Sequence, residues 1–93
     1  MVHTSAELLN SIRKLLLASG YVIVTRDRQI GRGDAKQWLP GPPIGARRYF
    51  NAGSRTVVDV TPHTTATWNA DTQTAGRVQP VSTVEFLRKL ENP

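Results

Sequence analysis

The sequence predicts an α+β fold. It is a two-layer sandwich with the element order α-β-(long loop)-β-β-β-α, in which a mainly antiparallel sheet carries both helices on one face. Two segments with a single apolar stripe at helical spacing stand near the two ends of the chain. Short β-branched segments joined by polar turns lie between them. A chain of 93 residues has room for one small core, so we expect residues 1–93 to form a single domain.

Both predicted helices begin with a capping box, in which a hydroxyl caps the first turn and a glutamate three residues later reaches back. These pairs are Thr4 with Glu7 and Ser82 with Glu85. Gly20 suits the position just after a helix, which predicts a first helix over about 4–19. The apolar stripes that should face the sheet are Leu8, Ile12, Leu15 and Leu16 in the first helix, and Phe86, Leu87 and Leu90 in the second.

The first part of the sheet should form around one interior strand and one hairpin. Residues 21–25 are β-branched or aromatic on both faces, which predicts an interior strand. Residues 47–50 and 56–60 are typical of two strands, and the turn residues 51–54 between them predict a hairpin.

Two further segments complete the predicted sheet. Residues 65–68 alternate with period two, which places Ala66 and Trp68 on one face. We expect Trp68 in the core; if the helices cover the opposite face, it would instead be an exposed binding anchor. Residues 77–79 are a candidate edge strand, which would permit a homodimer through strand pairing.

The segment 27–46 is a basic loop rich in proline and glycine. The run Pro40-Gly41-Pro42-Pro43 removes backbone donors and prevents a regular element from continuing through it. Loops of about twenty residues are uncommon in small domains, and they are commonly functional or disordered.

The net charge of +5 comes from one segment of the sequence. Residues 26–55 hold seven of the 12 cations and only two of the seven carboxylates, so the whole excess falls there. Six of these cations are arginines, which bind phosphate bidentately and stack on flat rings. Aromatic residues are interleaved with them, a pattern that suits contact with nucleic acid. The candidate nucleic-acid-binding residues are Arg26, Arg28, Arg32, Lys36, Trp38, Arg47, Arg48, Tyr49 and Arg55.

Successive strand residues point to opposite faces, so only one of Arg47 and Arg48 can lie on an open face of the sheet. The function we predict is a small basic nucleic-acid-binding module that acts through the arginine-rich loop and hairpin. One alternative is a non-enzymatic protein-interaction or inhibitor module, of mobile-element or phage accessory type, that docks on an acidic partner. A third is a small ribonuclease-like toxin with His63 as acid or base, oriented by Asp59 or Asp71.

Other classes of site have no support in the sequence. The cysteine count is zero and the two histidines are far apart, so we expect no metal, no cofactor and no catalytic residue. The enzyme class stays open, with a non-enzyme favoured. No apolar run is long enough to cross a bilayer, so we expect no membrane partner and a cytoplasmic location.

Two resemblances follow from these features. The order α-β-β-β-α and the element Gly41-Pro42-Pro43 before a strand are similar to double-stranded-RNA-binding domains. That family opens its second helix with a lysine-rich phosphate-binding motif, whereas residues 82–85 here contain no lysine. The resemblance therefore covers topology and three residues, and we assign no membership. Small basic ribonuclease toxins are similar in size and charge alone.

Overall fold

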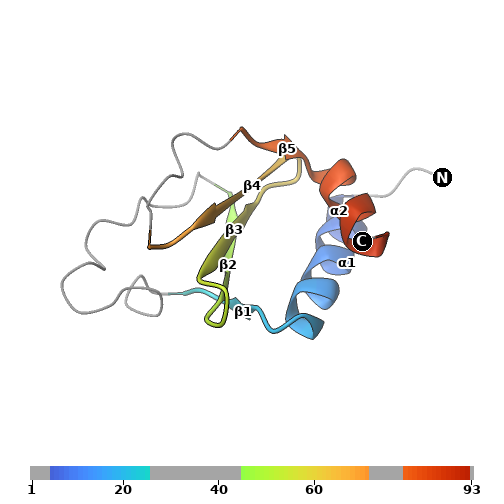
Figure 1. Ribbon diagram of the computed structural model, residues 1–93. Coiled ribbons are helices and arrows are strands. Elements are labelled where there is room, and N and C mark those ends of the chain that lie inside the picture. Colours follow the sequence, from blue (N-terminus) through green and yellow to red (C-terminus); the bar gives the residue numbers. More distant parts are fainter. Residues whose placement is uncertain (1–4, 26–44, 72–78, 93) are drawn as a thin grey trace.

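The computed structural model describes residues 5–25, 45–71 and 79–92, and within these ranges it shows two helices and one antiparallel sheet (Figure 1). The sheet has five strands in the order β1-β2-β3-β4-β5, so each strand pairs with its neighbour in sequence. The elements are α1 (Ser5–Ala18), β1 (Val22–Ile23), β2 (Arg47–Asn51), β3 (Thr56–Val60), β4 (Thr64–Asn69), β5 (Val81–Ser82) and α2 (Thr83–Glu91). The predicted α+β class is confirmed.

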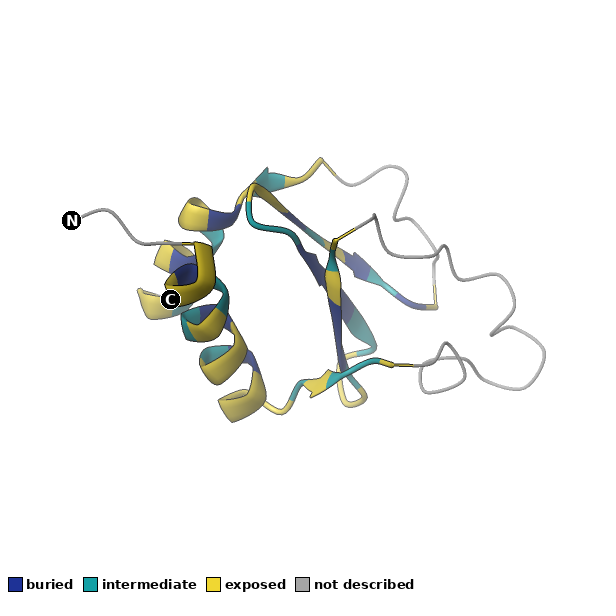
Figure 2. Cartoon of the chain, turned by 180° about the vertical axis from the view of Figure 1, so that it is seen from behind, coloured by how far each residue is buried: buried dark blue, intermediate teal, exposed yellow. Residues whose placement is uncertain are grey.

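The two helices lie side by side on one face of the sheet, as predicted (Figure 1). Buried side chains from both layers form the core between them: Leu8, Ile12 and Leu16 of α1, Leu87 of α2, and Tyr49, Val58 and Val60 of the sheet. The sides of both helices that face away from the sheet are exposed, whereas the central strands are largely buried (Figure 2). The helical stripes predicted from spacing therefore do face the sheet.

The end of α1 confirms the role expected for Gly20. Its φ of 93° lies in the left-handed region, which glycine tolerates best. The Gly20 N–H donates to the Leu17 carbonyl (3.3 Å) and the Tyr21 N–H donates to the Leu16 carbonyl (3.0 Å). This pair of hydrogen bonds is a Schellman motif, and it turns the chain directly from α1 into β1.

The start of α2 also follows the prediction. The Ser82 hydroxyl accepts a hydrogen bond from the Glu85 backbone N–H at 3.2 Å, which is the N-cap half of the predicted capping box. In the first helix the corresponding Thr4 lies outside the described residues. Thr83, the first residue of α2, is fully buried and donates its hydroxyl to the Thr61 carbonyl at 2.6 Å. The helix start is thereby tied to the turn before β4.

One prediction about the strands needs correction, and another falls mostly outside the described residues. Residues 21–25 were expected to be an interior strand, but among the described strands β1 pairs with β2 alone, and Val22 is 50% exposed. An edge strand can therefore carry apolar side chains on both faces. Tyr21 and Ile23 pack against the helix-side core, and Val24 packs against the cluster on the opposite face. The candidate edge strand at 77–79 lies outside the described residues except for Gln79, and the strand that pairs with β4 is β5.

Trp68 is buried as expected, at 3% exposure, but on the face of the sheet opposite the helices. Thr65, in the same strand, faces the helices instead, and its hydroxyl forms a hydrogen bond with the Thr83 hydroxyl at 3.0 Å. The alternative that Trp68 would be exposed under this arrangement is therefore wrong. Trp68 packs there in a second buried cluster with Phe50, Val57 and Ala70.

Candidate anion-binding pocket

Strand β2 places two adjacent arginines of the basic segment on opposite faces of the sheet. Arg47 faces α1 and is exposed, whereas Arg48 faces away from the helices and is 3% exposed. This follows from the period-two alternation of a strand. Of the two, only Arg47 is accessible to a ligand in this structure.

Arg48 is part of a buried cluster with an acidic and an aromatic residue. Its Nε and Nη2 donate to the two carboxylate oxygens of Asp59 at 2.7 and 3.0 Å. The Trp68 indole N–H donates to the same carboxylate at 3.1 Å, and the guanidinium lies 5.2 Å from the centre of the Trp68 ring. Arg48 is thus engaged inside the fold and is not accessible to a ligand.

Arg55 is also engaged within the fold. It has a φ of 58°, unusual for a residue other than glycine, at the end of the 51–54 turn. Its Nη2 lies 3.1 Å from an Asp71 carboxylate oxygen, and its guanidinium lies 5.0 Å from the centre of the Phe50 ring. The hairpin itself is confirmed: the Asn51 side-chain oxygen accepts from the Gly53 and Ser54 N–H groups and closes the turn.

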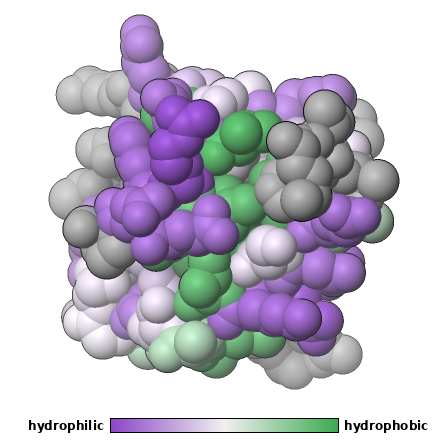
Figure 3. Space-filling view, turned by 90° about the vertical axis from the view of Figure 1, so that its right-hand side faces the viewer, coloured by the Kyte–Doolittle hydropathy of each residue, from purple (hydrophilic) through white to green (hydrophobic). Residues whose placement is uncertain are grey.

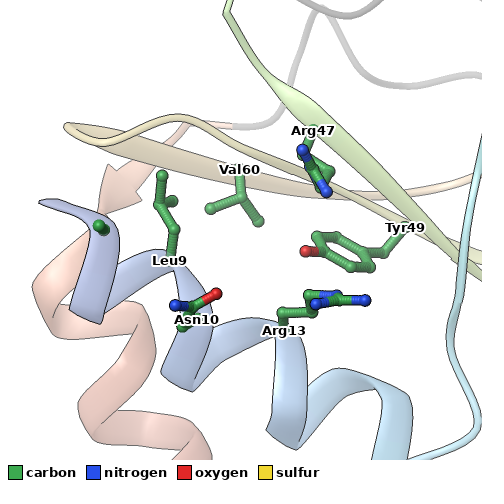
Figure 4. A pocket seen from close by; sticks show the side chains of 7 residues that line it. Leu9, Asn10, Arg13, Arg47, Tyr49 and Val60 are labelled. Atoms are coloured by element: carbon green, nitrogen blue, oxygen red, sulfur yellow. The ribbon is translucent and has the colours of Figure 1, made fainter.

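A pocket of about 240 Å³ lies between the N-terminal half of α1 and strands β2 and β3. Figure 4 shows Arg47 and Arg13 on either side of the Tyr49 ring, with the Tyr49 hydroxyl pointing into the pocket. Both arginines are exposed. Neither has an ion-pair or hydrogen-bond partner among the described residues. The remaining lining is Ala6, Leu9, Asn10 and Val60. Two cations that no described carboxylate neutralises therefore meet at this pocket.

Tyr49 does not act as the exposed stacking platform expected from the sequence. Only 2% of the residue is exposed and its ring packs in the core beneath α1. Burial raises the pKa of the Tyr49 hydroxyl above its ordinary 10.0, while the nearby Arg47 and Arg13 lower it. At neutral pH the hydroxyl is therefore protonated and can donate a hydrogen bond into the pocket.

The structure brings together only part of the predicted site. Arg47 and Tyr49 line the pocket; Arg48 and Arg55 are paired elsewhere. The predicted residues Arg26, Arg28, Arg32, Lys36 and Trp38 lie outside the described residues. Arg13 and Asn10 join the pocket from α1 and were not predicted from the sequence as site residues. Helical spacing puts Leu9 and Arg13 on one flank of α1, but the sequence does not say that this flank meets β2.

The ribonuclease alternative required an acid to orient His63. His63 is exposed in the turn between β3 and β4. Asp59 is held by Arg48 on the face away from the helices, and Asp71 is paired with Arg55, so neither carboxylate orients His63. In the described ranges no three acidic or histidine side chains gather to hold a metal ion.

Comparisons with known proteins do not assign the chain to a family. No protein-family model matches the chain, and no curated protein or solved structure matches it either. Within the described residues, neither helix has the length and apolar character needed to span a membrane. The functional argument therefore depends on the geometry and charge of this chain alone.

Proposed function

We propose that this protein is a small non-enzymatic nucleic-acid-binding module acting in the cytoplasm. The observation that carries the proposal is the meeting of Arg13 and Arg47 at the pocket between α1 and β2. They come from separate elements, and neither is neutralised by a described carboxylate. Guanidinium groups bind phosphate through paired N–H donors, so this arrangement supports phosphate as the ligand.

The charge distribution supports the same partner. Arg48 and Arg55 are neutralised by Asp59 and Asp71, which come from β3 and from the residues after β4. Arg47 of the basic segment lies beside Arg13 and has no ion-pair partner in the part of the chain that the structure describes. The cations of 26–36 belong to the same segment of the sequence. A net charge of +5 on a chain of this size attracts polyanions and accelerates their association.

Salt dependence of binding tests the proposal. The full-length protein is titrated into a fluorescein-labelled oligonucleotide, and the affinity is measured by anisotropy over a series of salt concentrations. Affinity should fall steeply with salt, and replacing Arg13 or Arg47 by glutamine should each reduce the log–log slope by about 1 if each contacts one phosphate. Lys14→Gln is the matched control, because Lys14 is an exposed cation next to Arg13 on α1. Absence of any DNA or RNA binding at low salt would refute the proposal.

A second candidate function is a protein-interaction module that docks on an acidic partner. On the side of the molecule that carries the helices, apolar side chains reach the surface and are flanked by polar ones, as Figure 3 shows. Among the described residues Leu17 of α1 and Val84 of α2 are 40% and 53% exposed. Recovery of one stoichiometric protein partner by affinity pull-down, unchanged by nuclease treatment and lost on charge neutralisation of Arg13 and Arg47, would favour this candidate over the first.

A further inference from the structure

The polar groups of the α1–β2 pocket are almost all donors. The guanidinium groups of Arg13 and Arg47 carry only N–H donors, and the Tyr49 hydroxyl is protonated. That hydroxyl has no hydrogen-bond partner among the described residues, although Tyr49 is a buried core residue. An anionic oxygen placed in the pocket would accept from the hydroxyl and from both cations, which is the donor set that a phosphate group matches.

The rest of the lining indicates that the ligand is more than a free phosphate. Ala6, Leu9 and Val60 present apolar surface to the same hollow. A phosphate ion alone would leave these side chains facing water, whereas the sugar and base of a nucleotide bring apolar surface against them. A volume of about 240 Å³ lies just below the range of roughly 300–1,000 Å³ that encloses a drug-sized ligand. The pocket can therefore enclose part of one nucleotide, with the rest of the strand lying outside it.

The concave shape of the pocket also favours one form of nucleic acid over another. In a duplex the bases are stacked and paired, so their faces are not available to a hollow in a protein surface. In a single strand the bases can be splayed out of the stack and enter a pocket one at a time. The concave site with cations at two sides of a buried tyrosine thus suits an unpaired nucleotide and not a helical backbone.

Resting on the proposed nucleic-acid function, we propose that the α1–β2 pocket binds one unpaired nucleotide of a single strand, with its phosphate between Arg13 and Arg47 and its sugar or base against Leu9 and Val60. Tyr49 contributes its hydroxyl as a donor to the phosphate, and its ring positions that hydroxyl from the core. Through this site the protein binds single-stranded nucleic acid in preference to duplex.

The experiment compares a labelled single-stranded oligonucleotide with the same sequence in a duplex, by anisotropy at one fixed salt concentration. Competition uses a nucleoside monophosphate, the same nucleoside without phosphate, and an acidic peptide. The variants are Arg13→Gln, Arg47→Gln and Tyr49→Phe, and Lys14→Gln is the control for net charge. Tyr49→Phe removes only the hydroxyl and keeps the ring in the core, and circular dichroism confirms that each variant is folded.

We expect the single strand to bind about tenfold more tightly than the duplex, and each of the three pocket variants to weaken single-strand binding by about tenfold. Lys14→Gln should weaken it much less. The nucleoside monophosphate should compete and the unphosphorylated nucleoside should not.

Three results would overturn the inference. If single strand and duplex bind equally and the pocket variants match Lys14→Gln, the pocket is not the site, while nucleic-acid binding itself stands. If the acidic peptide competes and the nucleoside monophosphate does not, the pocket is a carboxylate site for a protein partner. If no nucleic acid binds at all, the proposed function fails together with the inference.

Discussion

Replacement of Asp59 should strongly destabilise this fold. Its carboxylate accepts three hydrogen bonds, two from Arg48 and one from the Trp68 indole. The side chains of Arg48 and Asp59 are only 3% and 7% exposed. Asp59→Leu would leave a buried guanidinium without a counter-charge, and one of its nitrogens, Nη1, already lacks a hydrogen-bond partner.

The expected cost follows from this burial. Removing one partner of a buried ion pair costs about 3–5 kcal/mol, because the remaining charge is left uncompensated in a low-dielectric interior. Stability of small domains is of order 5–15 kcal/mol, so this single change removes a large part of it. Replacing both members, as Arg48→Met with Asp59→Leu, removes both charges and leaves mainly the unpaired Trp68 indole, at a cost of about 1–3 kcal/mol.

Urea unfolding followed by circular dichroism measures these costs. With a slope of about 1–3 kcal/mol per molar urea, a loss of 3 kcal/mol shifts the midpoint by about 1–3 M. The two single variants and the double variant form a cycle, and the double should be more stable than Asp59→Leu alone. The reasoning is refuted if the double variant loses the sum of the two single losses, which would mean that Arg48 and Asp59 do not interact.

Three further changes test local features of the structure. Ser82→Ala removes the N-cap of α2 and should lower the free energy of unfolding by about 1 kcal/mol. Ser82→Asp should keep most of that stability, because aspartate also caps helices. Equal stability of the original protein and both variants would contradict the cap. Gly20→Ala places a Cβ at a φ of 93° and should cost about 1–2 kcal/mol in the same assay, so an unchanged midpoint would contradict the Schellman ending. Burial raises the pKa of Tyr49, so the stability linked to its protonated form is present below its ordinary pKa of 10.0 and is lost as the pH rises through the higher folded-state value. Arg47→Gln should raise the pKa of Tyr49 further, because it removes a nearby cation; a lower value by phenolate absorbance would contradict that account.

The helices and the hairpin could be predicted from the sequence because their determinants are local. Capping at Ser82 and termination at Gly20 depend on groups within a few residues, and the Asn51 turn is closed by its own side chain. The position of β1 could not be predicted in the same way. Its apolar side chains indicated burial on both faces, but whether a strand has one neighbour or two depends on which segments pair with it.

The candidate site was predictable only in part. The sequence indicated the basic segment and named Arg47 and Tyr49, but it did not show that Arg48 and Arg55 are paired with Asp59 and Asp71. Those pairs join residues 11 and 16 positions apart, across neighbouring strands and at the end of a strand. No local pattern specifies such pairs.

The sequence alone therefore determined the α+β class, the end of α1, the cap of α2 and the segment where the positive charge is concentrated, because each depends on composition or on groups close along the chain. The tertiary structure decided which of the described cations of that segment is left accessible. Strand alternation directs Arg48 to a buried carboxylate and Arg47 to α1, where it meets Arg13 from a distant part of the chain. The function proposed here depends on that meeting, which exists only once the helix packs on the sheet.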